Sequence, residues 1–174
     1  QQRVAIARTL APKPKVLFMD EPLSNLDAKL RIEMRSELQR LHIETGSTFI
    51  YVTHDQMEAM TLATKICLIN NGVLQQYEAP LTIYNQPSNL FVADFVGNPS
   101  INLISMEGKL ENGEVKLAHK DVKLTFCPNE EITLPASGKV VLGVRPEFLK
   151  QQDHNSIQAT VESSLPSGME TILV

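Results

Sequence analysis

Two short apolar runs that end on polar residues constrain the fold of this chain more than any other feature. The segment 15–19 contains the run VLFM and leads into Asp20-Glu21, while 48–52 (TFIYV) leads into Thr53-His54-Asp55. Uninterrupted apolar strands separated by helical sequence are typical of a parallel sheet covered on both faces. The sequence therefore predicts an α/β fold with the strand residues in its core. These core residues are Val16, Leu17, Phe18, Phe49, Ile50 and Val52.

Helices are predicted on either side of these strands. One covers residues 3–11 and another covers 56–63. The longest, 27–45, has an amphipathic pattern, a good N-cap residue in Asp27 and a stop signal in Gly46. The alternation of strands and helices is that of an α/β domain.

The rest of the first half continues this alternation. Asn70-Asn71-Gly72 is a strong signal for a hairpin turn between two strands. The expected elements are strands at 65–69 and 73–77 and short helices near 79–85 and 88–95. Residues 1–97 are therefore predicted to form one domain.

The character of the sequence changes at Gly97-Asn98-Pro99. Short strand-like runs then follow one another closely, with turn sequences such as Asn112-Gly113 and Ser137-Gly138 between them. The expected strands are 102–106, 108–111, 114–118, 122–126, 139–144 and 156–163. Residues 98–174 are therefore predicted to form a small all-β domain of barrel or sandwich type.

Composition argues against several functions. The 16 Lys and Arg residues are scattered, and the net charge of -4 disfavours nucleic acid as a partner. No apolar run approaches the roughly 18 residues that a membrane span requires. Cys67 and Cys127 lie in apolar runs and are interpreted as buried, reduced thiols.

The polar residues after the two strands form a candidate site. The carboxyl ends of parallel strands are where phosphates bind in doubly wound folds. Asp20 at this edge is suited to binding Mg²⁺, and Glu21 to orienting or deprotonating a water. The alternative interpretation is that both are solvent-exposed acids at the start of a turn. A histidine at the end of a strand, such as His54, is most often a polar residue whose ring nitrogens are hydrogen-bonded to neighbouring groups, without a role in a site. Neighbouring strands would bring the three residues to one point, which is the requirement for a site.

The sequence around these residues resembles the ABC ATPases. LFMDEP, SNLDAKLR and YVTHDQMEAM are similar, in this order, to the Walker B strand, D-loop and switch-histidine segment of that family. QQRVAIARTLAPKP resembles the helix that follows the LSGGQ signature. The resemblance implies that Asp20 binds Mg²⁺, that Glu21 is the general base, and that His54 contacts the γ-phosphate of ATP. It also implies nucleotide-facing positions at a dimer interface, which are Gln2, Arg3, Ser24 and Asp27.

Further segments resemble carbohydrate importers of the maltose and multiple-sugar type. They include YEAP at 77–80, FVADFVG at 91–97 and GVRPE at 143–147. The resemblance implies that the β-rich half is a truncated regulatory domain similar to oligonucleotide/oligosaccharide-binding folds. The implied partners are transmembrane permease subunits, a second copy of the chain in a homodimer and, indirectly, an extracellular solute-binding protein. The implied location is the cytoplasmic face of the cell membrane, as a peripheral subunit.

Two motifs of a complete ABC ATPase are missing from the sequence. It contains neither the phosphate-binding pattern G-x-x-x-x-G-K-[ST] nor LSGGQ. We therefore expect a C-terminal piece that starts just after the signature and is inactive as an ATPase alone. Two alternatives stay open: a soluble ABC ATPase of DNA repair or translation, and a non-catalytic dimerisation or regulatory module built around residues 100–174.

Overall fold

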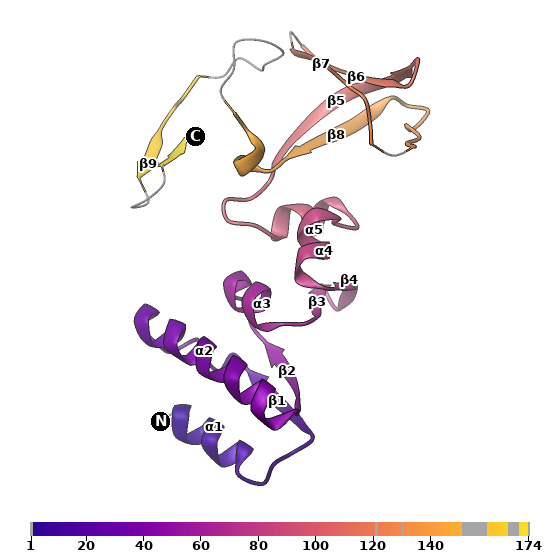
Figure 1. Ribbon diagram of the computed structural model, residues 1–174. Coiled ribbons are helices and arrows are strands. Elements are labelled where there is room, and N and C mark those ends of the chain that lie inside the picture. The colour runs from indigo at the N-terminus through magenta and orange to yellow at the C-terminus, as the bar shows by residue number, and fades with distance from the viewer. Residues whose placement is uncertain (1, 121, 130, 151–159, 167–170, 174) are drawn as a thin grey trace. The chain divides into compact units, whose positions relative to one another are not determined.

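The computed structural model of the chain forms two compact units, Gln1–Ser100 and Ile101–Val174 (Figure 1). It describes residues 2–120, 122–129, 131–150, 160–166 and 171–173. Among the described helices, none is long and apolar enough to cross a membrane. Each unit has its own apolar clusters and is described by itself.

The first unit begins with a small parallel α/β layer (Figure 1). Its elements are α1 (Gln2–Leu10), β1 (Val16–Asp20), α2 (Ala28–Thr45), β2 (Thr48–Val52) and α3 (Gln56–Leu62). β1 and β2 are parallel neighbours, with Val16 opposite Thr48 and Asp20 opposite Val52. As the sequence predicts, the two strand ends that carry the candidate residues lie side by side.

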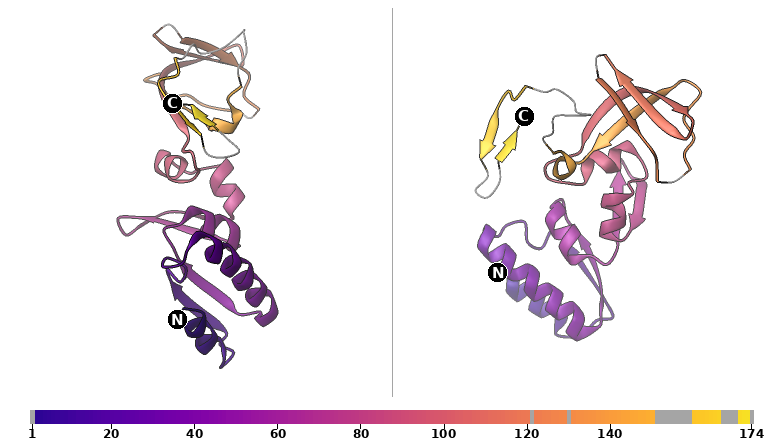
Figure 2. Two further views of the ribbon diagram at one scale, coloured as in Figure 1. Left: turned by 90° about the vertical axis from the view of Figure 1, so that its left-hand side faces the viewer. Right: turned by 45° about the horizontal axis from the view of Figure 1, so that its top comes forward.

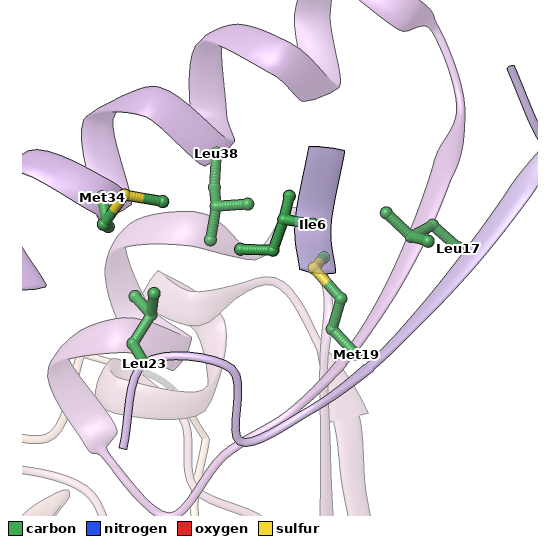
Figure 3. Packing of buried hydrophobic residues seen from close by; sticks show 6 residues of the cluster. All are labelled: Ile6, Leu17, Met19, Leu23, Met34 and Leu38. Atoms are coloured by element: carbon green, nitrogen blue, oxygen red, sulfur yellow. The ribbon is translucent and has the colours of Figure 1, made fainter. Parts of the chain in front are cut away.

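One face of the β1–β2 pair is packed against α1 and α2. Figure 3 shows the buried side chains of this cluster, with Ile6 of α1 beside Leu38 of α2. The cluster consists of Ile6, Leu17, Met19, Leu23, Met34 and Leu38. Phe49 and Tyr51 of β2 pack against it from the same face. Burial of this face stabilises the layer by removing apolar surface from water.

The opposite face of the pair is exposed, which corrects the predicted core. We call it the open face; its residues are Val16, Phe18, Asp20, Thr48, Ile50 and Val52. The exposed fractions are 44% for Val16, 73% for Phe18, 44% for Ile50 and 54% for Val52. The prediction of a sheet covered on both faces was wrong for the described residues, because α1 and α2 contact the same side (Figure 2).

The two ends of α2 follow the predicted signals. The Asp27 carboxylate accepts a hydrogen bond from the Leu30 N–H at 3.0 Å, which satisfies an amide of the first turn. At the other end Gly46 adopts a φ of 62° and donates its N–H to the His42 carbonyl at 3.1 Å. A residue without Cβ suits this left-handed conformation, so the predicted cap and stop are both confirmed.

A hairpin and two short helices complete the first unit. These elements are β3 (Ile66–Asn70), β4 (Val73–Glu78), α4 (Pro80–Asn85) and α5 (Leu90–Phe95). The hairpin turns at Asn71 and Gly72, whose φ values of 48° and 76° confirm the predicted turn. Leu68 is buried here with Ile83, Val92 and Val96.

Both cysteines are exposed, which corrects the prediction of buried thiols. Cys67 precedes the buried Leu68 on β3, and strand alternation turns it to the outer face. Cys127 comes directly after the last strand residue Phe126, beyond the packed part of its sheet.

The second unit is built on an antiparallel sheet of strand order β7-β6-β5-β8. Its elements are β5 (Asn102–Glu111), β6 (Glu114–His119), β7 (Val122–Phe126), β8 (Lys139–Val144), the 3-10 turn η1 (Pro146–Phe148), β9 (Ser164–Pro166) and β10 (Thr171–Leu173). Met106, Val115 and Leu117 are buried on one face of the sheet. Asn112 and Gly113, both with positive φ, form the predicted turn between β5 and β6.

Two predicted strand boundaries in this unit were wrong. The expected strands 102–106 and 108–111 are one strand, β5, which pairs with β8 up to Glu107 and with β6 from Glu107 onward. Gly108 permits this because a Cβ there would approach Val140 Cγ2 at 3.1 Å. Of the expected strand 156–163, residues 156–159 lie outside the described part, and 160–163 precede β9 without strand pairing.

Candidate functional site

The candidate site lies at the carboxyl ends of β1 and β2. Asp20 is the last residue of β1 and is paired in register with Val52. The next residue, Glu21, donates its N–H to the Val52 carbonyl at 2.8 Å. This bond holds the two chain segments together at the point where they leave the sheet.

The structure brings Glu21 and His54 into direct contact. His54 Nδ1 donates to Glu21 Oε1 at 2.9 Å, and the two side chains are 74% and 44% exposed, respectively. Glu21 has a φ of 42°, a left-handed conformation that is uncommon for a residue with a long side chain. Backbone strain of this kind is concentrated at functional sites. The turn out of β1 at Glu21 places its carboxylate beside the histidine.

The contact also changes the charge state of the histidine. The hydrogen bond to Glu21, followed by the negative charge of that carboxylate, raises the pKa of His54 above its ordinary value. The imidazolium form is therefore populated to a higher pH than for a free histidine. A cationic and accessible ring next to a carboxylate can contact both a phosphate and the water that attacks it.

Asp20 contributes a separate carboxylate at the same edge. It lies on the open face and is exposed to solvent. Within the described residues, no group of three or more His, Cys, Asp and Glu side chains is arranged to hold a metal ion. Mg²⁺ commonly binds one or two carboxylates together with phosphate oxygens and water, and it does not need a site made of protein ligands alone. A single carboxylate such as that of Asp20 is therefore compatible with this ion.

Ser24 and Asp27 lie in the segment that joins Glu21 to α2. Ser24 Oγ donates to the Glu21 carbonyl at 2.9 Å, and this bond stabilises the turn after the glutamate. The carboxylate of Asp27 caps α2, as described above. Both side chains thus have local structural partners in this segment.

Gln2 and Arg3 lie in the first turn of α1. Their side chains fall outside the described part of the structure. The predicted contribution of these two residues to a nucleotide site stays a prediction.

A buried acid near the site was missed by the sequence analysis. Glu58 of α3 is only 2% exposed, and its Oε2 accepts hydrogen bonds from Tyr51 Oη at 2.7 Å and Thr53 Oγ1 at 2.8 Å. Burial and the neighbouring Glu58 raise the pKa of Tyr51, which keeps its hydroxyl protonated as a donor. The one sequence signal was an acid three residues after the N-cap residue Asp55, a pattern that marks a helix start.

A second missed residue, Arg31, contacts both segments that leave the sheet. Its Nη1 donates to Asp55 Oδ2 and its Nη2 to the Leu26 carbonyl, each at 3.2 Å. An arginine on an amphipathic helix is normally assigned to the solvated face, so nothing in the sequence pattern indicated these contacts.

Two open hollows of about 670 and 780 Å³ occur in the second unit. The smaller one is lined in part by His119, Lys120 and Lys139, and neither hollow includes a candidate-site residue. They do not bear on the chemistry at Glu21 and His54.

The sequence of the chain is similar to those of several known proteins. No family model matches it. It is 43% identical over 178 residues to the uncharacterized ABC transporter ATP-binding protein YcjV of Escherichia coli O6:K15:H31 (strain 536 / UPEC), covering 99% of this chain and 49% of that protein. It is 43% identical over 174 residues to the maltose/maltodextrin import ATP-binding protein MalK of Photobacterium profundum, covering 98% and 47% of the two chains.

A third relative has a different stated role. The osmoprotective compounds uptake ATP-binding protein GgtA of Synechocystis sp. (strain ATCC 27184 / PCC 6803 / Kazusa) is 46% identical over 147 residues, which are 84% of this chain and 40% of that protein. The chain is therefore homologous to ABC transporter ATP-binding proteins, which are ATPases, and it spans about half of their length.

Proposed function

We propose that this chain supplies the part of an ATP-hydrolysing site that handles Mg²⁺ and water, within the ATP-binding subunit of an ABC importer. The observation that carries the proposal is the 2.9 Å contact of Glu21 with His54 at the ends of two parallel strands. In doubly wound folds this edge of the sheet is where phosphates bind.

Each acidic or basic group has a distinct role in this proposal. Glu21 is the general base that takes a proton from the water attacking the γ-phosphate of ATP. His54 contacts that phosphate and, through its hydrogen bond, orients the Glu21 carboxylate. Asp20 would help to hold Mg²⁺, which neutralises negative charge on the phosphates when it is bound.

Further positions are proposed to act at the interface of a homodimer. Ser24 and Asp27 lie in the segment after Glu21, and Gln2 and Arg3 begin a helix whose N-terminal dipole favours phosphate. The G-x-x-x-x-G-K-[ST] loop is not in this sequence. We therefore expect the 174-residue chain alone to be inactive, and ATP hydrolysis to need further sequence.

The transported solute is proposed to be a sugar or a related compound. Support comes from the relatives named for maltose/maltodextrin import and for uptake of osmoprotective compounds. The subunit would act as a dimer at the cytoplasmic face of the membrane, beneath transmembrane permease subunits that receive solute from a binding protein. Residues 1–97 would belong to the ATPase domain, and 98–174 to a regulatory domain similar to oligonucleotide/oligosaccharide-binding folds.

The proposal is tested by replacing Glu21 in a full-length subunit that carries this sequence. Glu21→Gln keeps the shape of the side chain and removes the base, so the rate of ATP hydrolysis should fall about 10²- to 10⁴-fold while ATP binding is retained. The matched control is Glu44→Gln, which changes an exposed acid paired with Arg40 on α2. Hydrolysis by the control should equal that of the unmodified subunit.

The decisive comparison is between the two variants. Near-normal hydrolysis in Glu21→Gln would overturn the assignment of Glu21 as the base. Rapid hydrolysis by the isolated 174-residue chain would overturn the proposal that the site needs further sequence.

A further inference from the structure

Arg31 joins the two segments that form the candidate site. It is the fourth residue of α2, and its guanidinium lies between the segment after β1 and the segment after β2. One nitrogen, Nη2, donates to the Leu26 carbonyl in the first segment at 3.2 Å. The other, Nη1, donates to the carboxylate of Asp55 in the second segment at the same distance. A single side chain therefore fixes the spacing of the two segments.

The position of Arg31 is unfavourable for the helix itself. The first turn of a helix carries partial positive charge, and a cation there is disfavoured. The Arg31 Nε is also the one buried side-chain polar atom without a hydrogen-bond partner among the described residues. An unsatisfied buried donor lowers stability. Residues that break local rules in this way are concentrated where function requires them.

The segments joined by Arg31 carry the groups proposed to do the chemistry. The first runs from Glu21 through Ser24 to Leu26, and Ser24 donates back to the Glu21 carbonyl. In the second, Asp55 directly follows His54. A shift of either segment would therefore change the separation of Glu21 from His54.

The second segment is anchored by hydrogen bonds on both sides of His54. Asp55 caps α3 by accepting from the Glu58 N–H at 3.1 Å. Its own N–H donates to Thr53 Oγ1 at 3.0 Å, and that hydroxyl donates to the buried Glu58 carboxyl group. His54 is thus held between two anchored residues, and Asp55 connects this anchor to Arg31.

We infer that Arg31 is a positioning residue that holds His54 beside Glu21 by fixing the two segments against each other. The inference rests on the proposed function of Glu21 and His54. Arg31 itself contacts neither ATP nor water in this proposal. It sets the geometry of the reacting groups. Hydrolysis is sensitive to that geometry because misplacement of a group by about 1 Å can lower a rate about 10²-fold.

The test compares two arginines of the same helix. Arg31→Met keeps an unbranched apolar stem and removes the guanidinium with both of its hydrogen bonds. The control is Arg40→Met, which removes ion pairs with Glu37 and Glu44 on the exposed surface of α2. In the full-length subunit, Arg31→Met should lower kcat for ATP hydrolysis about 10- to 100-fold with KM for ATP changed less than about twofold. Arg40→Met should leave both constants unchanged.

A spectroscopic measurement separates positioning from stability. In the 174-residue chain, the ring signals of His54 in NMR spectra should shift in Arg31→Met and stay in place in Arg40→Met. Arg31→Lys keeps a positive charge that can make one of the two contacts, but it lacks the planar guanidinium that makes both. Its kcat should therefore lie between those of Arg31→Met and the unmodified subunit. Normal kcat and unchanged His54 signals in Arg31→Met would overturn the inference. Loss of the fold in both Arg31 variants would also overturn it, because Arg31 would then act in stability.

The two proposals can fail separately. If Glu21→Gln abolishes hydrolysis while Arg31→Met hydrolyses ATP normally, the proposed function stands and the inference about Arg31 is wrong. If Glu21→Gln hydrolyses ATP normally, the proposed function is wrong, and the His54 signals still show whether Arg31 positions that ring.

Discussion

The two faces of the β1–β2 pair have similar apolar residues and opposite surroundings. On one face Leu17 and Met19 are 5% and 7% exposed, beneath α1 and α2. On the open face Phe18 and Val52 are 73% and 54% exposed. An apolar run therefore specifies a strand but does not specify what covers it. Coverage depends on elements contributed by other parts of the sequence.

The two faces also differ in what they carry at their ends. Asp20 terminates the open face, and Glu21 leaves the sheet directly after it. On the covered face Tyr51 ends close to Glu58, whose buried carboxyl group it contacts. The exposed acids belong to the proposed chemistry, whereas the buried one belongs to the support of the following helix.

The largest expected effect on stability comes from the covered face. Leu17→Ala removes buried methyl groups and leaves a cavity beneath the helices, so it should lower the free energy of unfolding by about 2 to 5 kcal/mol. Urea denaturation of the 174-residue chain measures this change. A loss below about 1 kcal/mol would show that the covered face is packed less tightly than the contacts of Leu17 indicate.

The neighbouring residue on the open face should behave differently. Phe18→Thr keeps a good strand former and removes the exposed ring, so the free energy of unfolding should change by less than about 0.5 kcal/mol. Binding of a dye that reports exposed apolar surface should decrease. If Phe18→Thr destabilised the chain as much as Leu17→Ala, the open face would have to be covered in solution.

The smallest expected effect on stability comes from the contact of Glu21 with His54, at the ends of the two strands. Because Glu21 raises the pKa of His54, their contact stabilises the fold fully below the unfolded pKa of about 6.5. This contribution is lost as the pH rises through the higher folded pKa. Both groups are exposed, so the effect on stability is small. An NMR titration should show an elevated pKa for His54 that falls in Glu21→Gln. An unchanged pKa in that variant would mean that the contact does not form.

Local signals in the sequence predicted local structure well. The cap at Asp27, the stop at Gly46 and the turn at Asn71-Gly72 each depend on a few adjacent residues, and all three were found. The parallel pairing of the two strands was also found, together with the approach of Glu21 to His54. Strand-end positions could be predicted because side-by-side parallel strands bring the same ends together.

Features that depend on distant contacts were not predictable. The exposure of Phe18 depends on which side the helices occupy, and the burial of Glu58 depends on Tyr51 of another element. The predicted break between 106 and 108 lies within the continuous strand β5, where Gly108 passes so close to Val140 of the neighbouring strand that a Cβ would approach it at 3.1 Å. The link from Arg31 to Asp55 crosses 24 positions of sequence and has no periodic signature.

The left-handed backbone of Glu21 has a consequence for how this sequence can evolve. Glycine or asparagine would adopt its φ of 42° with less strain, but neither provides the carboxylate of the proposed base. Mutations that stabilise a protein at such a position tend to reduce its activity. Selection for catalysis is therefore needed to keep glutamate at position 21. In a gene without that selection, we expect an early substitution of Glu21 by a residue that relaxes the turn.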